Sequence, residues 1–342
     1  MFINIVFYSL KRKHFKNQHN SGVNMYKKKS IALVVPAFNE QRLIVFTLKN
    51  VPKIIDKIYV VNDGSTDNTK KNITQLRKSD KRIILINHEK NKGLGQAIIT
   101  GYLKSYEDKN DITVVVGGDY QMDLSEVEKF LDPIVDGVAD FTKGNRFLYV
   151  ENIKEHMPKT RLLGNTLLSF ITKLSTGYWK IFDSNDGYTA ISNESIGKID
   201  WNSAWKWYGY NGDWMARFNV ANIRIKDIPR RPIYLKGERQ SQIKILKYIS
   251  RVGPHLVRMF FFRLKHKYLY KDFHPLVLFY LMSLTLILGG LIAAFYILWV
   301  KITGGIITGN TTIFSALMLI IGFQSLGFAI MFDLQDNQKL QP

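Results

Sequence analysis

Two stretches near the C-terminal end of this 342-residue chain contain no charged side chain, and they restrict the fold more than any other feature. They cover residues 276–300 and 311–332 and are joined by a short, glycine-rich connection. Each exceeds the ~20 residues that a helix needs to cross a bilayer core. A soluble core helix is rarely this long and this uniformly apolar, so we predict a hairpin of two membrane helices.

The net charge of +20 is concentrated in two regions. Residues 1–29 hold seven Lys/Arg and no acid, and residues 224–271 hold fourteen Lys/Arg against two acids. Basic flanks favour the cytoplasmic side of a membrane, so we expect a multi-pass protein whose N-terminal portion and short tail after residue 332 are cytoplasmic. The rest of the chain is nearly neutral, unlike a general nucleic-acid binder. We therefore expect membrane lipids, and no nucleic acid, as partners.

The composition divides the chain into four predicted parts. These are a poorly ordered N-terminal extension at 1–29, a large domain at 30–240, basic amphipathic helices at 241–274, and the membrane hairpin with its tail at 275–342. Met25 is a candidate for the true start, because the first predicted strand follows it directly. The amphipathic stretch mixes Lys/Arg with aromatic residues and is expected to lie on the membrane surface, broken at Pro254.

From residue 30 onward, short apolar runs alternate with amphipathic stretches. We predict strands at 31–35, 57–61, 82–86, 112–116 and 140–143, and helices at 41–50, 66–78, 94–106 and 125–135. This alternation is typical of an α/β fold with a Rossmann-like, mostly parallel sheet. Ligands of such sheets bind just beyond the carboxyl ends of the strands, so the residues after each strand are the candidate site.

The strand at 112–116 runs into Gly117 and Gly118, and then Asp119 and Gln121 follow at alternate positions. On one side of an extended segment, their two oxygens suit a hard cation such as Mg²⁺, which is commonly held by one or two protein oxygens plus substrate phosphates. The plainer interpretation is a helix start capped by Asp123 or Ser125. The chain has no cysteine, so a thiolate metal site is excluded.

Polar residues follow the other strands as well. Glu40 can reach a sugar or base, and Asp63 can accept from a base N–H or a ribose hydroxyl, although Asp63 alone also fits a turn residue. Lys92 and Gly93 suit a close approach of the backbone to a ligand, but a lone Gly-x-Gly is weak evidence.

Five motifs occur in order over about 120 residues: VVPAFNE, VVNDGSTDNT, NKGLGQAIITG, GGDYQMD and GNR. In this order and spacing the chain resembles family 2 glycosyltransferases of the GT-A fold, and in particular the polyprenyl-phosphate (dolichyl-phosphate) mannose and glucose synthases. The likeness continues through RLLGN, DSNDGYTAIS, GYNGDWM and YLKGERQS. Members with a C-terminal membrane hairpin match the apolar segments too.

The resemblance implies a role for each matching residue. The residues implied to bind the nucleotide sugar are Pro36, Phe38, Glu40, Asp63, Lys92, Gly93, Gly118, Asp119, Lys236 and Arg239. Metal binding falls on Asp119 and Gln121, and lipid-phosphate binding on Arg146, Arg161, Asn165 and Ser241. Arg146 also lies at the reaction centre with Asp213, which is either a positioning residue or a plain helix N-cap. Asp183 either orders the acceptor loop or forms an Asx turn.

The implied reaction moves a hexose or N-acetylhexosamine from a UDP- or GDP-linked sugar to polyprenyl phosphate on the cytoplasmic face, with inversion and with Mg²⁺ or Mn²⁺. Two departures matter. Gly117 replaces the first acid of the metal motif, and Lys236 replaces an arginine of the loop that closes over the pyrophosphate. Two alternative functions stay open: a polysaccharide synthase of the same fold and an inactive membrane scaffold. Whether the chain forms a homo-oligomer also stays open.

Overall fold

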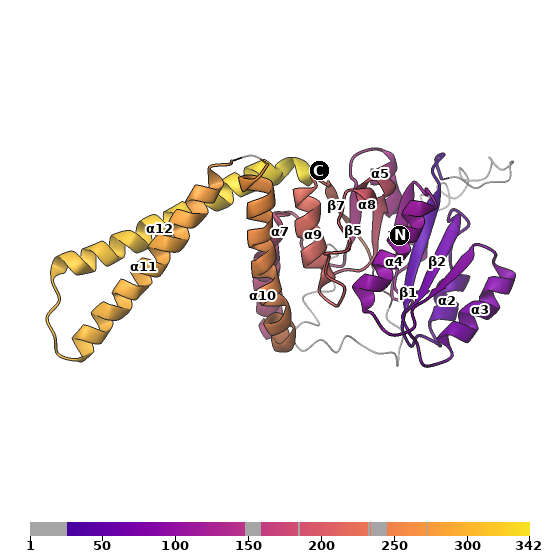
Figure 1. Cartoon of the computed structure of the whole chain (residues 1–342), viewed down its shortest axis with the longest axis horizontal. Helices are drawn as coiled ribbons and strands as arrows, with labels where there is room; N and C mark the ends of the chain where they lie inside the picture. The colour runs from indigo at the N-terminus through magenta and orange to yellow at the C-terminus, as the bar shows by residue number, and fades with distance from the viewer. Residues whose placement is uncertain (1–25, 148–158, 184, 232, 234–244, 272) are drawn as a thin grey trace, which may run out of the picture.

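The computed structural model describes residues 26–147, 159–183, 185–231, 233, 245–271 and 273–342 (Figure 1). Its centre is a seven-stranded sheet in the order β3-β2-β1-β4-β6-β5-β7. β6 is antiparallel to β4 and β5, and the other neighbours are parallel. The mostly parallel sheet is therefore confirmed. The strands are β1 Ile31–Ala37, β2 Lys57–Asn62, β3 Ile83–Asn87, β4 Ile112–Val115, β5 Phe141–Asn145, β6 Thr189–Ser192 and β7 Ile225–Pro229.

Helices connect the strands and continue into the hairpin. They are α2 Ile44–Lys49, α3 Thr69–Ser79, α4 Leu94–Glu107, α5 Val127–Val135, α7 Lys159–Thr176, α8 Asn193–Gly197, α9 Tyr210–Val220, α10 Ile245–Arg263, α11 Leu276–Ile302 and α12 Gly309–Asn337. Three short helices, η1 Leu124–Glu126, η3 Leu264–Leu269 and η4 Gln338–Leu340, complete the set in the described part of the chain.

Two predicted helices begin later than expected. α2 starts at Ile44 instead of residue 41, and α3 starts at Thr69 instead of residue 66. Asp67 accounts for both differences, because its carboxylate accepts hydrogen bonds from the backbone N–H groups of Thr69 and Gln41 at 2.9 and 3.2 Å. Local side-chain bonding of this kind competes with helix formation, and it ties together the loops after β1 and β2.

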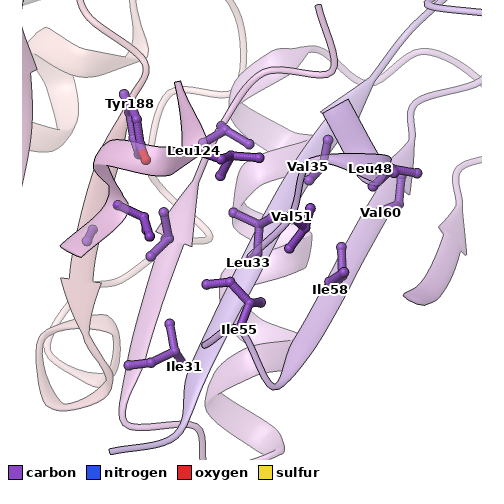
Figure 2. Packing of buried hydrophobic residues seen from close by; sticks show 14 of the residues in the cluster. Ile31, Leu33, Val35, Leu48, Val51, Ile55, Ile58, Val60, Leu124 and Tyr188 are labelled. Atoms are coloured by element: carbon purple, nitrogen blue, oxygen red, sulfur yellow. The ribbon is translucent and has the colours of Figure 1, made fainter. Parts of the chain in front are cut away.

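The sheet is buried on both faces. Ile31, Leu33 and Val35 of β1 point into one core cluster with residues from α2, α3 and α5 (Figure 2), whereas Ala32 and Val34 point into a second cluster with residues from α4, α8 and α9. Continuous apolar strands are expected where helices cover both faces of a sheet. The core therefore fixes the ends of β1 and β4, from which the candidate site projects.

Pro254 lies inside α10 and does not break it, so the predicted interruption is wrong. α10 packs along α7 and α9 and buries Val252, Leu256 and Met259. Leu256 comes so close to α9 that a Cβ at Gly212 would lie 2.6 Å from its Cδ2. This packing outweighs the ~3 kcal/mol that an interior proline costs an isolated helix.

α11 and α12 form the predicted hairpin, which extends away from the sheet (Figure 1). Both are long and apolar enough to cross a membrane. Their contact is lined by small residues: a Cβ at Gly290 would lie 2.7 Å from Leu319, and one at Gly322 would lie 2.8 Å from Ile287. Such residues let membrane helices approach closely.

The end of α12 packs into the domain that contains the sheet instead of forming a separate tail. The fully buried Asp333 accepts both hydrogen bonds of a bidentate pair from the fully buried Arg263, at 2.6 and 2.9 Å, and a third from Trp179 Nε1 at 3.2 Å. Asn337, also fully buried, donates to Tyr268 at 2.8 Å. We call these five residues, Trp179, Arg263, Tyr268, Asp333 and Asn337, the C-terminal junction.

The residues beyond the junction are equally enclosed. Leu340 lies in the core cluster that contains Ala32 and Val34 of β1. Gln341 accepts a hydrogen bond from Lys180 through its backbone oxygen at 2.8 Å. The second apolar helix therefore ends inside the domain whose sheet carries the candidate site.

Replacing Asp333 with alanine is expected to lower the free energy of unfolding by about 3–5 kcal/mol, because it leaves the buried Arg263 guanidinium without its partner. Glu194→Ala is the control, since Glu194 pairs with Lys198 at an exposed position outside the junction. Thermal unfolding of the detergent-solubilised proteins measures the difference. Equal stability of the two variants would show that the junction contributes no more than a surface pair.

Candidate active site

The carboxyl ends of β1 and β4 meet at Pro36 and Gly118. The backbone N–H of Gly118 donates to the Pro36 carbonyl at 3.2 Å, and a Cβ at Gly118 would lie 3.2 Å from the same oxygen. Phe38 follows β1 with 43% of its surface exposed, and Glu40 is fixed by a bond from its backbone N–H to Thr69 Oγ1 at 2.8 Å. The edge therefore offers an exposed aromatic ring beside a close backbone contact.

Asp63 directly follows β2 and is almost completely buried. Its carboxylate accepts from the backbone N–H groups of Lys92 and Gly93 at 2.9 and 3.0 Å and lies 2.6 Å from His88 Nδ1. The other ring nitrogen of His88 lies 3.0 Å from Thr100 Oγ1. Asp63 therefore fixes the Lys92–Gly93 loop, and its contact with a nucleotide stays a prediction.

Gly93 is a glycine for geometric reasons. Its φ of +97° is unfavourable for other residues, and a Cβ would lie 2.6 Å from the carbonyl oxygen of Lys206. The sequence indicated a close backbone approach here. The neighbour in the structure is the segment before α9, which lies against the start of α4.

Asp119 and Gln121 do not lie on an extended segment as predicted. β4 ends at Val115, and a turn follows in which Tyr120 has a φ of +56°. Asp119 Oδ1 accepts from the backbone N–H of Gln121 at 3.3 Å, which closes the turn. Asp123 accepts from the Ser125 N–H at 2.9 Å, so the predicted cap occurs beside the candidate metal residues.

The donor set at this turn is compatible with a divalent cation. Burial raises the pKa of Asp119, and the backbone N–H of Gln121 and the charge of Arg230 oppose this rise. A bound cation would favour its ionised form. No group of three or more acidic or histidine ligands occurs in the described ranges, so substrate phosphates would have to complete the coordination.

Gly117 also shapes the turn. A Cβ at this position would lie 2.7 Å from Asp119 Oδ1. The carboxylate of Asp119 thus occupies the space beside the missing first acid, and an acid at position 117 would require Asp119 to move.

Arg146 follows β5 and pairs with two buried acids. Its Nε and Nη2 donate to the two oxygens of Asp183 at 2.7 and 2.9 Å, and its Nε lies 3.2 Å from Asp186. Asp186 also accepts from Arg230 at 2.7 Å, and Arg230 Nη1 donates to the Gln121 carbonyl at 3.2 Å. We call Arg146, Asp183, Asp186 and Arg230 the arginine–aspartate network; it links Arg146 to the candidate metal turn.

Lys143 of β5 contacts this network through Asp186. It is fully buried, its Nζ donates to the Asp186 carbonyl, and burial lowers its pKa. Gly144 leaves room for Asp186, because a Cβ there would lie 2.7 Å from Asp186 Oδ1. The network is therefore packed tightly, while the Arg146 side chain keeps 35% of its surface exposed.

The hydrogen bonds of Asp213 are made with residues outside the arginine–aspartate network. It is 1% exposed and accepts from Arg217 Nε at 2.8 Å and from the backbone N–H of Trp205 at 3.0 Å, and it lies 3.2 Å from His255 on α10. It is not the predicted N-cap, because Gly209 occupies that position. Its observed contacts join α9 to α10, and a role in catalysis stays a prediction.

Several predicted site residues cannot be compared with the structure. Lys236, Arg239 and Ser241 lie outside the described residues. Arg161 and Asn165 lie on α7, but the described part of the chain does not include their side chains.

Sequence reasoning missed four residues that organise the site. These are His88, Asp186, Arg230 and Asp227, whose contacts join segments far apart in the chain. Arg230 carried one usable signal, since it directly follows a strand.

Comparisons with known proteins agree with this architecture. Residues 32–200 match the family described as Glycosyl transferase family 2. A UDP-N-acetylglucosamine–dolichyl-phosphate N-acetylglucosaminyltransferase from Methanococcus voltae is 33% identical over 221 residues, which cover 60% of this chain and 86% of the relative. An uncharacterised protein of Methanocaldococcus jannaschii is 34% identical over 218 residues, covering 64% and 87%.

Among solved structures, glucosyl-3-phosphoglycerate synthase from Mycobacterium tuberculosis with Mn²⁺, UDP and phosphoglyceric acid superimposes with a TM-score of 0.51 at 15% identity, over 72% of this chain and 84% of that one. This likeness shows the fold alone. The fold and the residues at its strand ends define a glycosyltransferase of the GT-A fold. The chain belongs to glycosyl transferase family 2.

Proposed function

We propose that the protein transfers N-acetylglucosamine from UDP-N-acetylglucosamine to dolichyl or another polyprenyl phosphate. The observation that carries the proposal is the arginine–aspartate network, which joins the partly exposed Arg146 to the turn of Asp119 and Gln121. The Arg146 guanidinium, which can bind an anion, and the candidate cation site then lie at the same edge of the sheet and are joined by these contacts. The Methanococcus relative, named for this donor and acceptor, supports the choice of sugar and lipid.

The chemistry needs positioning more than a strong base. A phosphate monoester has a second pKa of about 6, so the lipid phosphate is largely ionised at neutral pH and can attack the anomeric carbon directly. The nucleoside diphosphate leaves from the opposite side, which inverts the anomeric configuration. Arg146 can hold the attacking phosphate by charge-assisted hydrogen bonds, and Asp183 fixes the guanidinium orientation.

Asp119 and Gln121 would hold Mg²⁺ or Mn²⁺ together with the donor diphosphate. When bound, the cation neutralises charge that develops on the leaving group. The raised pKa of Asp119 means that protons compete with the cation more strongly as the pH falls.

The membrane part sets where the reaction occurs. On α10, Val257 and Phe261 expose 54% and 51% of their surfaces, opposite the face that packs on α7 and α9. We infer that this face meets the cytoplasmic leaflet, where each basic residue near anionic lipid contributes about 1 kcal/mol. The catalytic domain would then lie beside the lipid phosphate.

The proposal is tested with membranes that contain the protein and radiolabelled UDP-N-acetylglucosamine, UDP-glucose or GDP-mannose. We expect label in the organic extract with the first donor, and its loss when EDTA is added. Matched assays with the polyprenyl alcohol, which lacks the phosphate nucleophile, should give no product. Label from a different donor would correct the sugar, and label that persists in EDTA would overturn the metal assignment.

A further inference from the structure

Asp227 of β7 contacts both sides of the Arg146–Asp183 pair. Its Oδ2 accepts from Asn145 Nδ2 at 2.6 Å and from the backbone N–H of Phe182 at 3.3 Å. Asn145 immediately precedes Arg146, and Phe182 immediately precedes Asp183. One carboxylate therefore holds the residue before each member of the ion pair.

Asn145 extends this restraint past the arginine. Its side chain is 1% exposed, and its Oδ1 accepts from the backbone N–H of Phe147 at 2.9 Å. Asp227 and Asn145 together thus fix the backbone on both sides of Arg146. A β-strand alone would not do so, because β5 ends at Asn145.

The second oxygen of Asp227 shows that its charge is costly to the fold. Oδ1 is buried without a hydrogen-bond partner among the described residues. Burial raises the pKa of Asp227 to about 6; Asn145, the Phe182 N–H and Lys143 of β5 oppose the rise, and Asp183 adds to it. Lys173 of α7 also faces this carboxylate.

The sign of this effect matters for the test. The folded state binds the proton more tightly than the unfolded state, whose aspartate pKa is about 3.9. Stability therefore falls as the pH rises from about 4 to 6. At neutral pH the ionised carboxylate therefore makes the folded state less stable. A charge that lowers stability is not expected at a position that serves packing alone.

We propose that Asp227 is a positioning residue for sugar transfer, which fixes Arg146 and Asp183 relative to each other so that the guanidinium meets the acceptor phosphate in one orientation. This rests on the proposed role of the site. The ionised carboxylate makes stronger hydrogen bonds to Asn145 and Phe182 than a neutral group would. Its negative charge is therefore used for orientation at the expense of stability.

The experiment compares the full-length wild type with Asp227→Asn, which keeps the shape but removes the charge. We expect transfer to fall about three- to tenfold, as charge-assisted bonds become neutral ones, with a higher KM for polyprenyl phosphate and an unchanged KM for the nucleotide sugar. The unfolding midpoint at pH 7.5 should stay the same or rise. A drop in activity with a lower midpoint and both KM values unchanged would indicate a merely structural residue and overturn the proposal.

Asp140→Asn is the matched control. Asp140 forms a bidentate pair with Arg224 at the opposite end of β5 and β7, at 3.0 and 2.8 Å. Both KM values should be unchanged in this variant. An equal rise in the lipid KM of Asp140→Asn would mean that any disturbance of these strands has the same effect, and would overturn the proposal.

A second readout separates this inference from the proposed reaction. Backbone amide exchange of Phe147 and Phe182 does not depend on turnover, and both should exchange faster in Asp227→Asn. Unchanged exchange would contradict the positioning role. Failure of the wild type to label any lipid would instead contradict the proposed reaction, whatever the exchange rates.

Discussion

Asp119→Ala is expected to lower sugar transfer by at least about a thousandfold, or ~4 kcal/mol of transition-state stabilisation. Asp119 is the carboxylate of the turn that follows β4, and Gln121 offers only a neutral amide oxygen. The substitution therefore removes the one negative charge of the predicted metal pair. Because burial already raises the pKa of Asp119, its loss should leave the thermal unfolding midpoint unchanged or slightly higher.

The measurement is transfer of labelled sugar to lipid at saturating nucleotide sugar and divalent cation. Asp136→Ala serves as the control, since Asp136 is an exposed carboxylate that ends α5 and pairs only loosely with Lys27 at 3.7 Å. Wild-type transfer by Asp119→Ala would remove the metal assignment. Recovery of the variant at high Mn²⁺ would instead show that the diphosphate and Gln121 can hold the cation weakly.

Arg146→Lys is expected to reduce transfer about a hundredfold, although the charge is kept. A lysine ammonium cannot reproduce the planar, bidentate contact that Arg146 makes with Asp183. It would therefore present a different donor geometry to the acceptor phosphate. The KM for polyprenyl phosphate should rise, while the KM for the nucleotide sugar should change little.

Arg224→Lys provides a matched comparison, because Arg224 forms the same type of pair with Asp140 away from the strand ends that carry the site. Its transfer rate should stay within about twofold of the wild type, with only a small loss of stability typical of an exposed pair. If both lysine variants lose activity equally, Arg146 has no special role in the reaction.

The sequence was sufficient for the parts of the fold that depend on local pattern. Alternating apolar runs predicted β1 to β5, and the uncharged segments predicted α11 and α12. Pro254 was misjudged because a proline breaks an isolated helix, whereas α10 is stabilised by Leu256 and its neighbours against α7 and α9. Tertiary packing is not visible in a local pattern.

The residues of the candidate site also divide into those that the sequence predicted and those whose contacts depend on tertiary structure. Asp119 and Gln121 were predicted from their place just beyond the fourth strand, and Arg146 was predicted from the GNR motif of the resembled family. Asp186 and Arg230 were missed, because their ion pair joins positions 44 residues apart in the chain. Asp213 carried a motif signal, but its burial among Arg217 and His255 depends on where α10 packs.

The C-terminal junction also constrains the order in which the protein can be made. Residues 333–341 leave the ribosome after both apolar helices, yet Leu340 completes a core cluster that begins with Ala32 of the first strand. The catalytic domain therefore cannot finish folding until the hairpin has been synthesised and placed. Assembly of the complete domain therefore depends on synthesis of the whole hairpin, and a chain that ends before residue 333 lacks part of the domain's own core.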